Sequence, residues 1–162
     1  LNLLNEAWSD NWGYVPLTEA EIAYAGKKLK PLIFNELVRV AEVDGEPVAF
    51  MLTIPDINEL IKDLNGELFP FNFVKLLWRL KVKGVKTARV PLMGVRRDVG
   101  GWLQAVLPFL IVDSMRREAK QLGYEQIELS WILEDNLPMR RIIEAVGTSR
   151  YKTYRLYEKS LR

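Results

Sequence analysis

The sequence predicts a single domain of the mixed α/β class. Two observations support this prediction. Asp44-Gly45 stands between two segments rich in Val and Phe, which indicates an antiparallel hairpin. Between residues 86 and 132, a strand pattern, a long helix pattern and a second strand pattern follow one another, which indicates a right-handed parallel crossover. A length of 162 residues fits one globular domain better than two, so we assign residues 1–162 to one domain.

The composition is that of a folded protein with nearly balanced charge. Hydrophobic residues make up 49% of the chain and charged residues 27%, which argues against disorder. Lys and Arg number 23 against 21 Asp and Glu, a balance that gives no general argument for nucleic acid or an acidic surface. The longest apolar stretch, residues 105–112, is far shorter than the roughly 20 residues of a membrane span. We therefore expect neither nucleic acid nor a membrane among the partners.

Two residue types are missing from the sequence. There is no cysteine, which excludes disulfides and thiol chemistry and makes a cytoplasmic protein the simplest expectation. There is no histidine, which removes the commonest general base and the usual zinc ligand, and we expect no metal site. Any proton transfer must therefore use carboxylates, Tyr, Lys, water or the backbone.

Local signals define the elements of the first half. Residues 3–8 form a helical pattern, and the chain begins in it without an initiator Met, so we expect the natural protein to extend further. Thr18 and Glu21 form a capping-box signature that opens a helix ending near Lys30. Strands are expected at 37–43 and 48–53, a short helix at 56–64 that Asn65-Gly66 ends, and a helix at 74–80 closed by Gly84.

The aromatic cluster of residues 69–73, with Trp78, is too apolar for an ordinary loop. It either covers an acyl or acceptor site or packs against another domain. Trp12 and Tyr14 allow the same two interpretations. For at least one of these groups, we favour packing against a missing N-terminal domain or a second copy.

The second half alternates strands and helices. Residues 86–95 form a strand in which Pro91 and Gly94 indicate a bulge or a separation from a neighbour. The clearest helix spans 103–122 and stops at Gly123. The later predictions are a strand at 126–133, a helix at 138–146 capped by Asp135 or Asn136, and a final strand at 151–159.

The turn before the clearest helix is the best candidate for a ligand site. Free amides and the positive end of a helix dipole favour anions such as phosphate. Gly100 and Gly101 let a ligand approach the backbone, and Arg96 and Arg97 add positive charge. On spacing alone, a plain tight turn is the commoner explanation for such a glycine pair.

These segments resemble the GNAT superfamily of acetyl-CoA-dependent N-acetyltransferases. The matching segments are the strand end 92–95, the turn and helix through 122, the strand 128–133, and the Asn-led helix with 134–136, 139–141 and 144–147. The resemblance implies a mixed, mostly antiparallel sheet with a central parallel strand pair and helices on both faces. It also implies that the first strand of the fold is missing from this chain.

The resemblance further implies that acetyl-CoA or another acyl-CoA is the cofactor and that an amine attacks its thioester. Pantetheine would bond main-chain groups near Met93 and Val95, and a backbone N–H near Met93 would meet the oxyanion. The pyrophosphate would lie on amides from Val99 to Gln104. The cofactor-binding residues carried over are Met93, Gly94, Val95, Arg96, Arg97, Val99, Gly100, Gly101, Trp102, Leu103, Gln104 and Asn136.

Three residues are candidates for catalysis: Glu128, Ser130 and Tyr154. Glu128 is a possible general base near the cleft, although pairing with a neighbouring Lys or Arg is the favoured alternative. Tyr154 is a possible acid, with packing in a strand as the alternative, and Asn136 serves as a cap, a ligand group or both.

Two positions depart from the GNAT pattern and support a second hypothesis. Gln104 stands where the superfamily usually has a small residue, and Ile143 falls where many members carry a proton-donating Tyr. The first hypothesis is an N-acyltransferase acting on a small-molecule or peptide amine. The second is a catalytically degenerate domain that serves ligand binding or assembly.

A closer resemblance links nearly the whole chain to a group of bacterial proteins about twice as long, with a GNAT-like fold in their C-terminal half and no assigned substrate. The matching segments are 5–8, 11–18, 64–71, 128–136 and 151–159.

Overall fold

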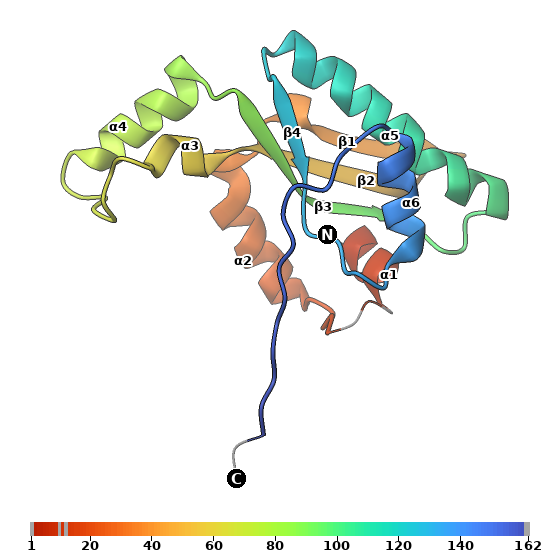
Figure 1. Ribbon diagram of the computed structural model, residues 1–162. Helices are drawn as coiled ribbons and strands as arrows, with labels where there is room; N and C mark the ends of the chain where they lie inside the picture. Colours follow the sequence, from red (N-terminus) through yellow and green to blue (C-terminus); the bar gives the residue numbers. More distant parts are fainter. Residues whose placement is uncertain (1, 10, 12, 161–162) are drawn as a thin grey trace. The chain divides into compact units, whose positions relative to one another are not determined.

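The structure, a computed structural model, describes residues 2–9, 11 and 13–160 (Figure 1). Trp12, one of the aromatic residues singled out above, therefore lies outside the described residues. The packing divides the chain into two compact units, residues 1–131 and 132–162.

A four-stranded sheet forms the centre of the first unit. Its strand order is β1 (Val38–Val43), β2 (Glu46–Pro55), β3 (Thr87–Val95), β4 (Gln126–Leu129). The first two pairings are antiparallel and β3 pairs with β4 in parallel, which confirms the predicted mixed sheet. The turn between β1 and β2 has positive φ at both Asp44 (53°) and Gly45 (83°), the conformation that matches the twist of a two-residue hairpin.

Helices cover both faces of this sheet. Met51 and Val90 point toward α5 (Gly101–Gln121) and join its Leu107 and Met115 in the hydrophobic core. Because successive strand residues point to opposite faces, Phe50 and Gly94 face the other side, where Gly94 lies close to Ala7 of α1 (Asn2–Trp8). The predicted helix arrangement is therefore confirmed.

Two of the remaining helices of the first unit begin with a side-chain cap. Thr18 and Glu21 form the predicted capping box before α2 (Glu19–Leu29). The Asp56 carboxylate accepts from the Asn58 amide at the start of α3 (Ile57–Ile61). The other helical segments are the 3₁₀ turns Lys30–Leu32 and Asn35–Leu37, and α4 (Asn72–Trp78), which continues as the π-helical stretch Arg79–Lys83.

Strand β3 bulges and leaves its neighbour at the same place. In its pairing with β2, the two residues Val90 and Pro91 lie opposite the single residue Thr53, and its pairing with β4 ends at Val90. Pro91, which lacks an amide hydrogen, lies at this point, so the predicted bulge and separation are confirmed. Beyond it, β3 runs on toward Val95 alongside β2 only.

Several predicted boundaries differ from the structure, among them the end of the helix predicted at 56–64, which is α3 and ends at Ile61. Strand β4 ends at Leu129 instead of residue 133, because β3 offers it no paired residue beyond Val90. Trp131, which falls within the predicted strand, therefore lies beyond the end of β4, and its side chain is 82% exposed. Helix α5 begins at Gly101, two residues earlier than predicted, with Gly100 as its N-cap.

The second unit contains α6 (Leu137–Ala145) and an extended segment. The Asn136 side chain accepts from the Met139 amide at 3.2 Å, which confirms its role as a cap. Residues 148–160 are exposed and form neither helix nor strand, so the predicted strand at 151–159 is wrong. Aromatic residues favour strands only where a neighbouring strand supplies hydrogen bonds and a surface to pack on.

Candidate functional site

The open edge of β3 is the first component of the site. The Arg96 amide donates to the Val48 carbonyl at 2.8 Å, and the pairing with β2 is regular from Val95 to Leu92. In an antiparallel ladder, alternate residues direct their main-chain groups to the same neighbour. Met93 and Val95 therefore direct their N–H and C=O groups away from β2, toward the edge that β4 has left.

Helix α1 contacts the same edge. The Trp8 indole Nε1–H donates to the Met93 carbonyl at 2.8 Å, which shows independently that this carbonyl faces away from β2. The Trp8 ring also meets Tyr14 edge-on, with ring centroids 5.8 Å apart. Asn5 holds the loop of Tyr14 in place by accepting from the Tyr14 hydroxyl at 2.6 Å and from the Leu17 amide at 2.9 Å.

The second component is the turn between β3 and α5. The Gly100 carbonyl accepts from the Leu103 and Gln104 amides at 2.9 and 3.2 Å. Within the described part of the chain, the Gly101 and Trp102 amides donate to no protein acceptor, so they are among the donors available to an anion at this helix end.

The glycines of this turn have no role in the protein's own packing. A Cβ added at Gly100 or Gly101 would meet no atom within 4 Å, and neither residue has positive φ. Trp102 is 71% exposed and Gln104 is also exposed, so neither side chain fills the space. The turn is open to a ligand.

The cations of the turn differ in their surroundings. Arg96 forms an ion pair with Asp98, through Nε at 2.9 Å to Oδ1 and through a second contact from Nη2, and it reaches Glu6 of α1 at 3.4 Å. The carboxylate of Asp98 holds the pKa of Arg96 above its ordinary value. Arg96 therefore fixes the turn to α1, whereas the Arg97 side chain is exposed beside it.

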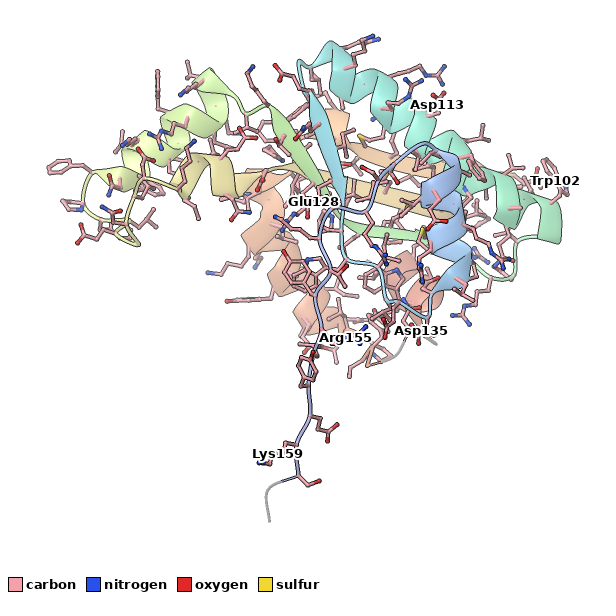
Figure 2. All side chains as sticks on the ribbon, viewed as in Figure 1. Trp102, Asp113, Glu128, Asp135, Arg155 and Lys159 are labelled. Carbon is pink, nitrogen blue, oxygen red and sulfur yellow. The ribbon has the colours of Figure 1, made fainter. Side chains whose placement is uncertain are left out.

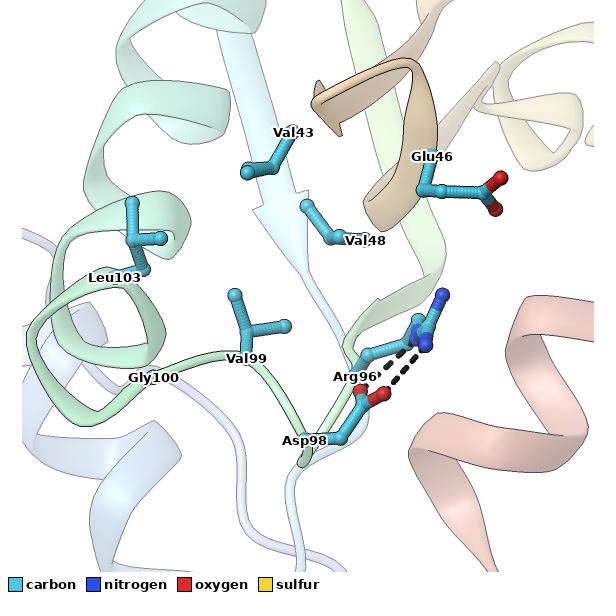
Figure 3. Close-up of a pocket in the computed structure, with 8 residues that line it drawn as sticks. All are labelled: Val43, Glu46, Val48, Arg96, Asp98, Val99, Gly100 and Leu103. Atoms are coloured by element: carbon cyan, nitrogen blue, oxygen red, sulfur yellow. Dashed lines mark hydrogen bonds and ion pairs between the residues drawn. The ribbon is translucent and has the colours of Figure 1, made fainter.

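A pocket of about 380 Å³ lies on the β2 side of the turn (Figure 3). Four aliphatic side chains converge on it, those of Val43, Val48, Val99 and Leu103, while Arg96 and Asp98 form its polar wall. It includes Val99 and Gly100 of the turn but neither Met93 nor Val95. The pocket is therefore separate from the open edge of β3, and the two meet only at the turn.

Glu128 lies where β3 and β4 are still paired. It is the cross-strand partner of Arg89, and Arg89 Nη2 lies 2.8 Å from Glu128 Oε1 in a contact where the Glu128 side chain is only 13% exposed (labelled in Figure 2). Its neighbours Ile127 and Leu129 join the core, so Glu128 faces the opposite side of the sheet, which is the side of α1. This geometry agrees with the favoured alternative for Glu128, which is a strand carboxylate paired with a neighbouring Lys or Arg.

The remaining predicted residues are placed as follows. Ser130 is half-buried just after β4 ends, and Gly94 is buried against Ala7. Tyr154 is 70% exposed in the extended segment of the second unit, and Asn136 caps α6 in the same unit. Their predicted roles stay predictions. Sequence reasoning missed the contacts of Trp8 and Arg89, because each depends on a partner that only the folded chain brings near.

The fold is that of the GNAT acetyltransferases. Aminoglycoside acetyltransferase AAC(6')-Iy, solved with a CoA-containing bisubstrate analogue, has a TM-score of 0.57 at 14% identity, covering 99% of this chain and 91% of that one. A ribosomal-protein-alanine N-acetyltransferase from Brucella melitensis has a TM-score of 0.56 at 15% identity, covering 98% and 88%. An aminoglycoside 6'-N-acetyltransferase from Acinetobacter haemolyticus gives 0.56 at 17%, covering 100% and 90%. At such identities, the likeness shows the fold alone.

Two curated proteins are much more similar in sequence. The bacterial ceramide synthase of Caulobacter vibrioides is 51% identical over 98% of this chain, and protein YghO of Escherichia coli is 47% identical over 98%. The chain spans 42% and 41% of these relatives' lengths. No family model matches the sequence.

The described residues contain no cluster of Asp or Glu side chains that could hold a metal ion. No helix among them combines the length and apolar character that a membrane span requires.

Proposed function

We propose that this chain binds an acyl-CoA and takes part in the transfer of its acyl group to an amine. The observation that carries the proposal is the combination of an open β3 edge with an open glycine turn at the start of α5. The edge offers main-chain groups at Met93 and Val95, and the turn offers amides at Gly101 and Trp102.

Each component suits a different part of the cofactor. The pantetheine arm carries amides, which pair with a strand edge as another strand would. The diphosphate is an anion, which amides at a helix N-terminus stabilise through their hydrogen bonds and the helix dipole. Because Gly100 and Gly101 leave open space above the backbone, phosphate oxygens can reach these amides without displacing protein atoms. The likeness to CoA-binding GNAT structures supports the same assignment.

The chemistry proposed is direct aminolysis of a thioester. The neutral amine nitrogen attacks the thioester carbon, the carbon–sulfur bond breaks, and the proton lost by nitrogen is balanced by the one that the CoA thiolate gains. The Met93 amide, which faces the open edge, is placed to donate to the oxyanion that develops on the carbonyl oxygen. A preorganised donor of this kind is worth about 3 kcal/mol of barrier.

The relatives support a narrower substrate class. A ceramide is the amide of a fatty acid with the amino group of a long-chain amino alcohol, and its formation from acyl-CoA is the reaction just described. Identity of 51% to a bacterial ceramide synthase therefore supports a fatty acyl-CoA as donor and a long-chain amino alcohol as acceptor. Because the chain spans 42% of that relative, this activity is proposed for the whole protein.

The proton-transfer groups proposed are Glu128, Ser130 and Tyr154. Glu128 lies on the α1 side of the sheet, one residue before the parallel strands separate. Its carboxylate forms an ion pair with Arg89, so accepting a proton from the amine would require that pair to loosen. Ser130 follows at the point of separation.

A second candidate function is a degenerate GNAT-like domain that binds ligand or assembles without catalysis. Ile143 on α6, where many GNAT enzymes have a Tyr, is the observation that favours it. The two functions differ in one result: both predict binding of CoA, but only the first predicts amide formation.

The test is a thermal-shift measurement with CoA. Ligand at about a hundred times its dissociation constant should stabilise the fold by roughly 2.7 kcal/mol. The double variant Gly100→Ala/Gly101→Ala places two methyl groups in the open turn and should reduce the CoA-dependent shift. Alanine at position 101 favours the helix, whereas alanine at the N-cap position 100 is less favourable than glycine. Because these effects oppose each other, the free energy of unfolding without ligand should change by less than about 1 kcal/mol.

Gly26→Ala is the matched control, because Gly26 lies in α2 and an added Cβ also meets nothing within 4 Å. It should keep the full CoA-dependent shift. Absence of a shift in the unaltered protein at millimolar CoA would refute the proposed site. A normal shift without release of free thiol, when a fatty acyl-CoA and sphinganine are supplied to the whole protein, would favour the degenerate domain.

A further inference from the structure

A row of exposed apolar side chains follows the outer face of α4 and the loop before it. Phe69 and Phe71 of the loop are 75% and 81% exposed, and Val74, Trp78 and Val82 are 63%, 55% and 69% exposed. The last three are spaced four residues apart, so they share one face of the helical stretch from Asn72 to Lys83. All five side chains are exposed in the described part of the chain.

The same segment is basic. Residues 68–83 contain Lys75, Arg79, Lys81 and Lys83 and no acidic residue. Lys81 and Lys83 are exposed, and the Lys81 ammonium lies 4.5 Å from the centroid of the Phe34 ring. Lys75 and Arg79 pair with Asp63, so we call Phe69, Phe71, Val74, Trp78 and Val82, together with Lys81 and Lys83, the aromatic–basic patch.

The aromatic–basic patch is held on a structured support. Arg79 points inward, with 16% of its side chain exposed, and donates to the Leu60 carbonyl of α3 at 2.6 Å and to Asp63 Oδ2 at 2.7 Å. Leu80 is buried beside it. In Figure 1, α4 precedes β3, whereas the glycine turn follows β3, so the patch and the proposed cofactor turn lie at opposite ends of the same strand.

We propose that the aromatic–basic patch docks the protein on an anionic membrane surface. A helix that lies in a lipid interface has one apolar face with Trp, Phe or Leu and lysines beside it, and it binds through buried apolar area and attraction to anionic headgroups. The patch has both features, and lysine stems can lie along the acyl region while their ammonium groups reach the phosphates. A protein partner fits less well, because lysine is depleted at protein interfaces.

The stretch of twelve residues from Asn72 to Lys83 is about 18 Å long, so it lies on a bilayer and does not cross the roughly 30 Å hydrocarbon core. The proposal replaces our sequence-based expectation of no membrane partner, which depended on the absence of a spanning segment. It goes beyond the proposed function and does not depend on it. A protein whose acceptor and product are lipids would nevertheless gain access to both at such a surface.

The experiment is co-sedimentation of the purified protein with vesicles of phosphatidylcholine alone or of phosphatidylcholine and phosphatidylglycerol in equal parts. We expect at least about tenfold stronger partitioning to the anionic vesicles, since each surface lysine contributes roughly fivefold. Phe71→Ser/Val82→Ser should reduce that partitioning by about tenfold or more, because it removes two large apolar groups from the interface. Lys81→Gln/Lys83→Gln should remove most of the preference for anionic lipid.

Two variants serve as matched controls. Tyr24→Ser/Leu110→Ser removes two other exposed apolar side chains, which are 65% and 57% exposed, and Lys27→Gln/Lys28→Gln removes two exposed lysines of α2. Both should partition like the unaltered protein. Failure of the unaltered protein to bind anionic vesicles would overturn the proposal, and so would an equal loss in the patch and control variants. CoA-dependent thermal shifts on the same samples show that each variant is folded and test the proposed function separately.

Discussion

At Gly94, the backbone of β3 passes so close to α1 that a side chain has no room. An added Cβ would lie 2.7 Å from the Ala7 Cβ and 2.8 Å from Phe50 Cε1. At Gly101, the same addition meets nothing within 4 Å. The resemblance grouped both glycines as cofactor-binding residues, but Gly94 has a packing reason inside the protein and Gly101 has none.

Gly94→Ala should therefore destabilise the protein by about 1–3 kcal/mol through overpacking. Urea unfolding measures this change. The double variant Gly94→Ala/Ala7→Gly removes the nearest clash and should therefore be more stable than Gly94→Ala. Its recovery is partial, because glycine at position 7 slightly destabilises α1. Equal stability of Gly94→Ala and the unaltered protein would show that α1 does not approach β3 as described.

Contacts between distant residues set the limit of residue-level prediction. A carboxylate in a strand indicates pairing with a nearby cation, so an ion pair at Glu128 could be anticipated. The sequence did not indicate that the partner is Arg89. The bond from Trp8 to the Met93 carbonyl joins residues 85 positions apart, and no local pattern indicates it. Such contacts depend on strand order and register, which the whole fold decides.

At the scale of elements, α4 is attached to the body of the first unit by a small charged cluster. Asp63 receives hydrogen bonds from Arg79 and from Lys75, whose Nζ lies 2.9 Å from Asp63 Oδ2. The Arg79 guanidinium, and then the Lys75 ammonium, hold the pKa of Asp63 well below its usual range. The carboxylate therefore stays ionised and keeps α4 on α3 at every pH near neutrality.

Asp63→Asn should loosen α4 without unfolding the sheet, because it leaves Arg79 without its ionic partner. Hydrogen exchange should show faster exchange of amides in 72–83, while β2 and β3 keep their protection. Global stability should change little, because the Asp63 carboxylate is 44% exposed and water screens its ion pairs. Asp113→Asn, which removes ion pairs within α5, is the control and should leave exchange in α4 unaltered. Unchanged exchange in both variants would contradict this role of Asp63.

Elements with local signals were predicted well, and elements that need a neighbour were not. The capping box of α2 and the Asp44-Gly45 turn each involve only a few consecutive residues, so their formation depends little on distant parts of the chain. The end of β4 and the fate of residues 151–159 depend instead on whether another strand lies alongside. Pro91 is the exception, because its missing amide hydrogen indicated a strand separation from sequence alone.

At the scale of the whole molecule, the proposed site combines segments that are far apart in the chain. The open edge belongs to β3, the donors belong to α5, and α1 supplies the indole that contacts the edge. The fold class followed from the order of the elements and from the GNAT resemblance. The separation of the pocket from the open edge did not, because it depends on which side of β3 each side chain occupies.

The whole molecule also has an unusual set of titrating groups, since it contains neither histidine nor cysteine. Its clearest shifts lie in the acidic range. Hydrogen bonds from Arg96 lower the pKa of Asp98, and those from Arg116 lower the pKa of Asp113. A carboxyl group whose pKa is lowered by folding stabilises the folded state above its unfolded pKa, and that contribution is lost as the pH falls toward the folded pKa.

The opposite shift belongs to tyrosines. Burial raises the pKa of both Tyr14 and Tyr124, so their contribution is complete below about pH 10 and is lost as the pH rises further. We therefore expect the free energy of unfolding to be nearly constant from about pH 5 to 9, where no histidine or cysteine titrates, and to fall below about pH 4 and above about pH 10. Urea unfolding across this range measures it. A slope between about pH 6 and 8 would require a carboxyl or amino group with a pKa moved close to neutrality by folding. That result would contradict the charge pairing described here and would direct attention to Glu128 beside the open edge.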